Sequence, residues 1–285
     1  MTHEAETVRR AVAALPAPQS SLEVVRKAIR ATENSERGNA HLEQILLADP
    51  GVTARVLRLA NSAYFGVSRH VSTVSIAIAI IGLDRLRKLL RHVLVSQVFD
   101  ALQARRPEAV PIWRTSVAAG AAAYVIARLC RKGDPEELLT IGLLHNVGEF
   151  ALLSKFPDEY LAVQRIAGGR LSAEGMRVVF GVGAGEVSQW LLDAWSFPPK
   201  FGQAAALWRN AKGSEDSNPP GPEVCVIHAA VSVAEAWVEG LDEEEAFARI
   251  SPQVVAEIHL DPGLLHKLYG QLAPEVLETE ALLQS

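Results

Sequence analysis

Residues 48–66 read ADPGVTARVLRLANSAYFG, and they give the clearest indication of the fold class. Asp49 is a typical helix N-cap, and Pro50 is favoured at the first helical position because its missing amide hydrogen is not needed there. Apolar residues then recur every three or four positions, and a turn is expected at Gly66. The stretch therefore predicts an amphipathic helix that begins at Pro50 and ends near Asn61.

The same helical spacing of apolar residues continues through almost the whole chain. A second helix start is marked by Asp134 and Pro135, with Glu137 at the position that completes a capping box. Alternating runs bounded by Asn-Gly or Asp-Gly turns, which would indicate strands, do not occur. The chain is therefore expected to be all-α. The predicted helices cover residues 3–14, 20–32, 39–48, 50–61, 73–81, 83–105, 109–132, 135–153, 157–167, 172–180, 184–195, 199–210, 223–239, 243–249, 252–259, 262–271 and 274–283.

Two breaks divide the predicted helices. Residues 212–222 read KGSEDSNPPGP, which contains three prolines and no aliphatic or aromatic side chain and is typical of a surface loop. A gentler break lies at Arg105, Arg106 and Pro107. The expected organisation is an N-terminal helical lobe over residues 1–106, a second helical lobe over 107–210, a surface loop over 211–222, and C-terminal helices over 223–285 that complete or cap the second lobe.

Composition narrows the class of protein. Hydrophobic residues make up 49% of the 285 residues, which is enough for a sizeable core without disulfides. The two cysteines, Cys130 and Cys225, are far apart in the sequence and are interpreted as reduced thiols. A net charge of −5 argues against a protein that mainly wraps nucleic acid, although a local basic face is compatible with it.

No segment has the features of an export signal or a membrane span. The first six residues include two glutamates, and no apolar run follows them, so we expect no export. The longest uncharged stretches, near residues 71–83 and 115–127, are shorter than the roughly 20 residues that cross a bilayer. The sequence therefore predicts a cytoplasmic protein without a transmembrane helix.

Residues 74–86 read VSIAIAIIGLDRL, and residues 142–148 read GLLHNVG. The second of these stretches resembles the Leu-Leu-His-Asp-Ile-Gly helix of the HD phosphohydrolases. Taken in order with residues 15–18 (LPAP) and 48–66, the two stretches resemble the HDOD family of bacterial signalling domains over about residues 15–210. The resemblance implies an all-helical pair of lobes, of which the second is similar to a degenerate HD-domain core.

The resemblance also indicates where an HD hydrolase would hold its metal. Such an enzyme needs several histidines and carboxylates around a divalent ion that activates water. His145 is followed here by Asn146, whose neutral amide is a poorer ligand than the family's aspartate. Thr115, Ala184 and Val231 stand where relatives often carry further ligands. These vestigial positions imply a chain that has lost the metal site, uses no cofactor and is not an enzyme.

Several residues near these positions are interpreted as structural. His145 is expected to be a helix residue that hydrogen-bonds a neighbouring carbonyl, and His228 a core residue in an apolar helix. Four tryptophans in the second half are expected to pack between helices, with the alternative that they line what remains of the metal pocket. They are Trp190, Trp195, Trp208 and Trp237.

The helix that follows Leu83 is the first candidate binding surface. It carries Arg85, Lys88, Arg91 and His92, and three of these residues share one helical face. This face fits either an ordinary solvated surface or a site for an acidic partner or a phosphate group.

Asn61 and Tyr64 form a second candidate surface. They lie where a predicted helix ends and a loop begins. They fit either a recognition surface or a helix cap with an aromatic side chain that fills a gap between helices.

The leading hypothesis is a bacterial signal-transduction or regulatory module that acts through contacts with an unidentified signalling protein. One alternative is a metal-dependent phosphohydrolase of nucleotides or cyclic dinucleotides, which would require a complete ligand set. Another is a metal-free sensor that binds a small phosphorylated ligand through Arg or Lys. The sequence leaves the partner, the pathway and the oligomeric state open.

Overall fold

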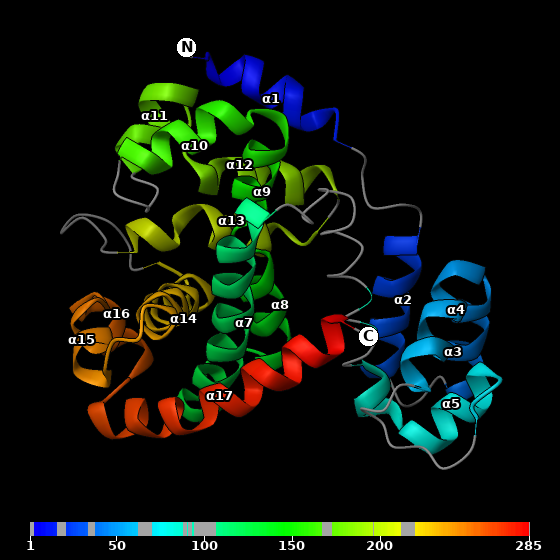
Figure 1. Ribbon diagram of the computed structural model, residues 1–285. Coiled ribbons are helices and arrows are strands. Elements are labelled where there is room, and N and C mark those ends of the chain that lie inside the picture. Colours follow the sequence, from blue (N-terminus) through cyan, green and yellow to red (C-terminus); the bar gives the residue numbers. More distant parts are fainter. Residues whose placement is uncertain are drawn as a thin grey trace. The chain divides into compact units, whose positions relative to one another are not determined.

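A computed structural model describes residues 3–15, 21–33, 38–61, 70–87, 90, 93, 107–166, 173–195, 197–211 and 220–284. Within these ranges every regular element is a helix, and none is a strand (Figure 1). The prediction of an all-α fold is therefore confirmed.

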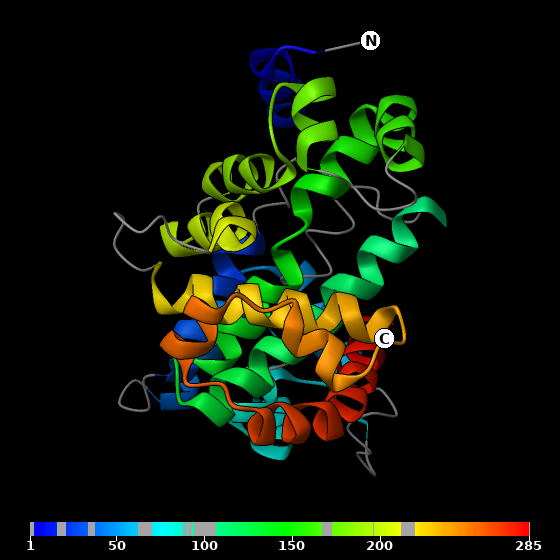
Figure 2. The ribbon, with the colours of Figure 1, turned by 90° about the vertical axis from the view of Figure 1, so that its left-hand side faces the viewer.

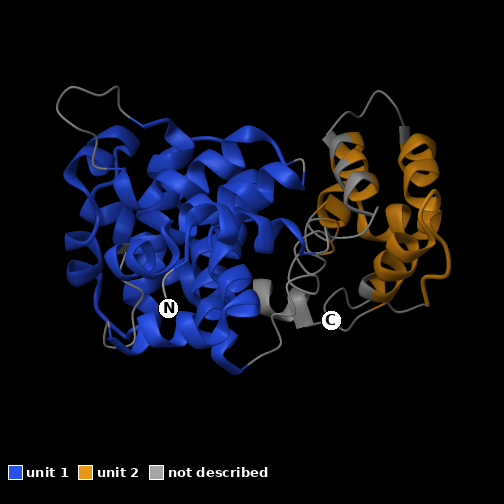
Figure 3. Ribbon diagram, turned by 90° about the horizontal axis from the view of Figure 1, so that it is seen from above, with its two compact units in different colours: residues 1–17, 102–276 blue, residues 18–101, 277–285 orange. Residues whose placement is uncertain are grey.

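The chain divides into two compact units (Figure 3). Unit 1 contains Met1–Ala17 and Leu102–Val276, and unit 2 contains Pro18–Ala101 and Leu277–Ser285. This division differs from the expected N-terminal lobe over residues 1–106, because the first helix belongs to unit 1.

The helices of unit 2 pack around side chains that the sequence pattern identifies as apolar. They are α2 (Ser21–Glu33), α3 (Gly38–Leu47), α4 (Pro50–Ala60) and α5 (Val74–Ile81). The predicted start of α4 is confirmed, since the Asp49 carboxylate accepts hydrogen bonds from the amides of Gly51 (2.8 Å) and Val52 (3.1 Å). Of the predicted helix over residues 83–105, residues 83–87, 90 and 93 are helical, and the others lie outside the described ranges.

Unit 1 contains the larger set of helices. They are α1 (Ala5–Ala13), η3 (Pro107–Ala109), α7 (Val110–Cys130), α8 (Pro135–Leu144), α9 (Val147–Lys155), α10 (Pro157–Ile166), α11 (Ala173–Phe180), α12 (Ala184–Ala194), α13 (Pro199–Leu207), η4 (Trp208–Asn210), α14 (Pro222–Val238), α15 (Glu243–Ala248), α16 (Pro252–Ile258) and α17 (Pro262–Gln284), whose end is grouped with unit 2.

The core of unit 1 is built on α7, which packs against both α8 and α14 (Figure 1, Figure 2). The two helices α7 and α8 approach closely at Gly142, which has no side chain. A Cβ atom at this position would lie only 2.7 Å from the carbonyl oxygen of Ala119. By length and composition alone, residues Pro107–Cys130 could cross a membrane, but 67% of the apolar window is buried inside the protein. A core helix shows this pattern.

Helix α1 contacts α9 and α12 of unit 1. Val8 and Val12 form its buried side, and the guanidinium of Arg9 lies 5.5 Å from the centre of the Trp190 ring. His3, two residues before the helix, stacks against Phe180 with 6.0 Å between ring centres. These contacts explain why α1 groups with unit 1 although residues 18–101 follow it in sequence.

Two predicted helix boundaries are wrong. The single helix predicted over residues 135–153 is two helices, because the chain turns at His145 and Asn146 between α8 and α9. The break predicted between residues 271 and 274 does not occur, since α17 continues through Pro274. Both Pro274 and Gly270, four residues earlier, are exposed, so the carbonyl that loses its helical partner can bond water instead.

Candidate functional site

His145 lies at the turn between α8 and α9, and its side chain is almost completely buried. Its Nδ1 donates a hydrogen bond to the carbonyl oxygen of Gly142 at 2.5 Å, as expected for a helix residue. Its Nε2 is therefore the lone-pair nitrogen, and it has no hydrogen-bond partner in the described part of the chain. Burial lowers the pKa of His145 to about 4. The hydrogen bond to Gly142 opposes this shift, and the positive charge of Arg209 adds a smaller contribution to it. The imidazole is thus neutral at physiological pH.

A serine fixes the backbone on both sides of this turn. The hydroxyl of Ser188, on α12, donates to the carbonyl oxygen of His145 at 2.9 Å and accepts from the amide of Gly148 at 2.9 Å. Both groups lie at helix ends, where backbone groups lack partners within their own helix. Ser188 therefore holds the end of α8 and the start of α9 against α12.

One turn after His145, the carboxylate of Glu149 is buried on α9. It accepts a hydrogen bond from the hydroxyl of Tyr160 at 3.3 Å and pairs with the guanidinium of Arg209, also at 3.3 Å. Burial raises the pKa of Glu149, and Glu235 adds to this, whereas Arg209 and Tyr160 oppose it. The result is a buried carboxylate whose two oxygens are both engaged.

Trp208 connects the histidine to the arginine. Its ring meets the edge of the His145 imidazole, with 5.6 Å between the ring centres, and the guanidinium of Arg209 lies 4.2 Å from its centre. The Trp208 carbonyl oxygen accepts a hydrogen bond from Nδ1 of His228 at 2.7 Å. Nε2 of His228 accepts from the amide of Ser251 at 3.1 Å, so both ring nitrogens are engaged. This arrangement agrees with a structural interpretation of His228.

The other vestigial positions bring no imidazole or carboxylate to this turn. Thr115 is half-buried on α7, Ala184 is the first residue of α12, and Val231 is buried on α14. Within the described ranges, no three His, Cys, Asp or Glu side chains are arranged to hold a metal ion. The donors present, one neutral imidazole and the amide of Asn146, do not fit the metal centre of an HD hydrolase.

The first predicted surface lies on unit 2 and is only partly described. Arg85 is exposed, whereas Lys88, Arg91 and His92 lie outside the described residues.

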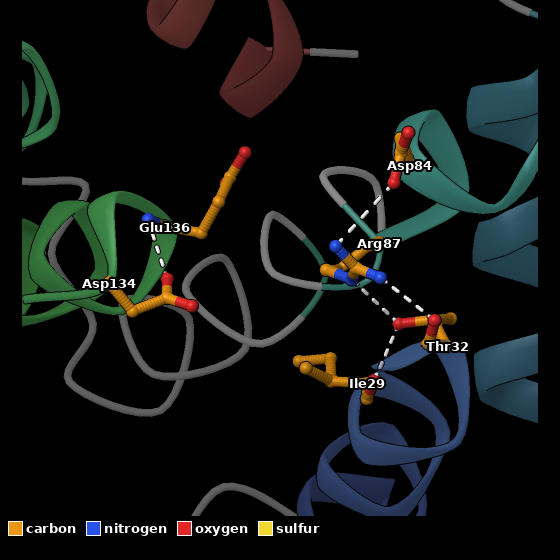
Figure 4. A network of polar contacts seen from close by, with 6 residues as sticks. All are labelled: Ile29, Thr32, Asp84, Arg87, Asp134 and Glu136. Carbon is orange, nitrogen blue, oxygen red and sulfur yellow. Dashed lines mark hydrogen bonds and ion pairs between the residues drawn. The ribbon is translucent and has the colours of Figure 1, made fainter. Parts of the chain in front are cut away.

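Arg87, which helical spacing places off the face predicted for Arg85, Lys88 and His92, has a structural role (Figure 4). Its Nε and Nη2 donate to the hydroxyl (2.9 Å) and the carbonyl oxygen (2.8 Å) of Thr32, near the end of α2. Arg87 therefore caps the C-terminal end of α2, where cations are favoured by the helix dipole.

At the second predicted surface, Tyr64 lies outside the described residues, and Asn61 is held by the backbone. Its side-chain amide donates to the carbonyl oxygens of Leu57 and Val71, at 2.7 Å each, and its oxygen accepts from the amide of Val71 at 2.7 Å. Asn61 thus closes α4 and fixes the chain that leads into α5.

Sequence reasoning missed Ser188, Glu149 and Tyr160 as parts of this site. Only Glu149 carried a usable signal, because a residue four positions after His145 lies on the same face of the single helix predicted over residues 135–153. The other two reach the site from α10 and α12. Their approach depends on tertiary packing, which residue spacing does not encode.

A family model for the HDOD domain matches residues 18–210. An uncharacterized protein of Treponema pallidum (strain Nichols) is 24% identical over 227 residues, which cover 78% of this chain and 42% of that protein. The chain therefore spans less than half the length of this curated relative.

Solved structures share the fold at low sequence identity. An HDOD domain protein of unknown function from Geobacter sulfurreducens is 19% identical, with a TM-score of 0.66 and 91% of each chain covered. A protein of Shewanella amazonensis SB2B, provisionally named a phosphohydrolase, is 21% identical, with a TM-score of 0.66 and coverage of 95% of this chain and 99% of that one. The match to the family model extends over more than half of the residues, and the chain belongs to the HDOD domain family.

Proposed function

We propose that this chain is a non-catalytic regulatory module of bacterial signal transduction, which acts in the cytoplasm through contacts with another protein. The observation that carries the proposal is the donor set of unit 1. Asn146, Thr115, Ala184 and Val231 stand where an HD hydrolase would place ligands, and Glu149 is engaged by Arg209. Hydrolysis on a divalent metal requires several ligands and a bound water. This site is better suited to holding helices together than to activating water.

Helix α5 offers a surface for such a contact. Val74, Ala77, Ile78 and Ile81 form its buried side, yet Ile76 and Ile80 on the opposite side are 39% and 50% exposed. The helix contains no charged residue. Helices that are apolar all round are normally buried on both sides, and exposed apolar patches often mark interaction sites. We call the exposed side, Ser75, Ile76, Ala79 and Ile80, the α5 outer face.

The charge next to the α5 outer face indicates the chemistry of the partner. Arg85 is exposed and follows α5 after only three residues, and Lys88, Arg91 and His92 follow it in the sequence. A complementary surface would combine an apolar strip with acidic residues at its edge. We therefore propose a partner protein that presents an amphipathic helix with acidic flanks to α5.

The proposal is tested by photo-crosslinking in the native host. A benzophenone amino acid replaces Ala79 on the α5 outer face, and as a matched control it replaces Val178, which is 63% exposed on α11 of unit 1. A specific adduct is expected from position 79 that is absent at position 178 and is lost when Ile76 and Ile80 are both changed to Asp. No adduct at position 79, or equal adducts at both positions, contradicts the proposal.

The phosphohydrolase alternative is tested on the untagged protein. Metal content is measured by mass spectrometry, and hydrolysis of bis(4-nitrophenyl) phosphate is followed with Mn²⁺, Mg²⁺ or Zn²⁺ added. We expect neither a full equivalent of metal nor turnover. A stoichiometric metal with turnover would contradict the non-catalytic proposal. Stabilisation by nucleotides in the presence of a chelator would instead favour the sensor of a phosphorylated ligand.

A further inference from the structure

The starting observation is the buried carboxylate of Glu149. Its side chain is 10% exposed, and an ionised carboxylate is strongly disfavoured at such a site unless a counter-charge compensates it. Glu235 contributes further negative charge at this position. Tyr160 supplies one neutral hydrogen bond, so among the described residues Arg209 is the cation paired with Glu149.

The position of Arg209 is fixed from its own side of the contact. Its guanidinium lies on the ring of Trp208, which is buried, and the Trp208 carbonyl oxygen is bound by His228. The same tryptophan ring meets His145. The positive charge of Arg209 acts to lower the pKa of His145 as well as that of Glu149. The guanidinium is therefore held beside the histidine that an HD hydrolase would use as a metal ligand.

We propose that Arg209 is the resident cation of this HD-like core and supplies the positive charge that a divalent metal supplies in a hydrolase. Arg209 is a positioning residue: it neutralises Glu149 and fastens η4 to α9. The core then gains no stability from divalent ions. The inference rests on the proposed non-catalytic function, but it concerns only the inside of unit 1 and is independent of the α5 outer face.

The experiment is a double-mutant cycle on the full chain, followed by urea unfolding with a probe in unit 1. The variants are R209M, E149Q, R209K and the double variant R209M/E149Q. R177M is the matched control, because Arg177 pairs with Glu186 at 3.0 Å in the same unit while both side chains are largely exposed. Each protein is measured with a chelator and with added Mg²⁺, Mn²⁺ or Zn²⁺.

R209M is expected to lower the folding equilibrium constant by about 10- to 100-fold, since it leaves a buried carboxylate uncompensated while Arg209 is itself only partly buried. Adding E149Q is expected to recover most of this loss, and R209K to retain part of the stability. R177M is expected to change the constant by about fivefold or less. The wild type should unfold at the same urea concentration with metal and with chelator.

Two results would overturn the inference. One is a loss of stability in R209M that is no larger than the loss in R177M, or that is the same whether or not E149Q is also present. The other is a wild-type protein that divalent metal stabilises. Neither result changes the outcome expected from crosslinking at the α5 outer face. If the crosslinking fails instead, the double-mutant cycle on Arg209 and Glu149 still tests this inference.

Discussion

The hydroxyl oxygen of Ser188 lies 2.9 Å from the amide nitrogen of Gly148, and this hydrogen bond joins α12 to the first turn of α9. The two helices can come this close because residue 148 has no side chain. A Cβ atom there would lie 2.1 Å from the carbonyl oxygen of Ala184 and 2.6 Å from the amide nitrogen of Ser188. Glycine at position 148 is therefore required by packing.

Replacing Gly148 with Ala should destabilise unit 1 by about 3 kcal/mol or more, because the added carbon meets backbone atoms that cannot move independently. Urea unfolding measures the loss. Gly270→Ala is the control: no atom lies within 4 Å of a Cβ at this position inside α17. The control should preserve stability or raise it by up to about 1 kcal/mol. Equal effects of the two substitutions would disprove the packing argument.

Replacing Asn61 with Ala should destabilise unit 2 by about 2 kcal/mol, since the amide and carbonyl of Val71 both lose a partner. Hydrogen exchange at the Val71 amide is the direct measurement, and it should become faster. Asn61→Asp should retain the bond to this amide but lose both donated bonds, so it is expected to fall between the wild type and the alanine variant. Unchanged exchange in the alanine variant would refute the role of Asn61 as a backbone clamp.

The buried imidazole of His145 makes stability depend on pH. Its pKa is lowered to about 4 in the folded state, so between this value and the unfolded value near 6.5 the unfolded chain binds more protons. Stability should be complete above about pH 6.5 and should fall as the pH decreases toward 4, by on the order of 3 kcal/mol. His145→Asn retains a donor for Gly142 but removes this titration. If the asparagine variant shows the same slope of stability against pH, the prediction is wrong.

Arg87→Met should loosen the C-terminal end of α2, at a cost of about 2 kcal/mol, because two hydrogen bonds from a charged group are lost. Hydrogen exchange along α2 should report the change. Arg85→Met removes a neighbouring but exposed cation and is expected to alter stability by about 0.5 kcal/mol or less. Under the proposed function, the Arg85 variant should instead weaken crosslinking from position 79. A destabilised Arg85 variant would contradict this division of roles.

A helix end could be predicted from the sequence where a capping residue next to it marks the position. Asp134 accepts hydrogen bonds from the amides of Glu136 and Glu137, at 2.9 Å each, as its position before Pro135 indicates. The turn after Leu144 has no such mark. Asn146 occupies the N-cap of α9, but its side chain makes no capping bond, and Ser188, more than 40 residues away, secures the turn instead.

The candidate site was predictable only in part for the same reason. The resemblance located His145 and Asn146, and the sequence indicated correctly that His145 bonds a neighbouring carbonyl. It could not indicate that Arg209 reaches Glu149 across 60 positions, or that Arg87 reaches Thr32 across 55. Such pairs depend on how helices pack, and an arginine in a polar helical stretch looks alike in sequence whether it is solvated or bound.

The position of α1 has a consequence for the order in which the protein assembles during synthesis. His3 binds Glu159, 156 positions later in the chain, so α1 leaves the ribosome long before the surface that receives it. At about 5–20 residues per second, this interval lasts roughly 8–30 s. The N-terminal helix therefore has no receiving surface while the residues of unit 2 are made, and it can dock only after α9 and α12 have been synthesised.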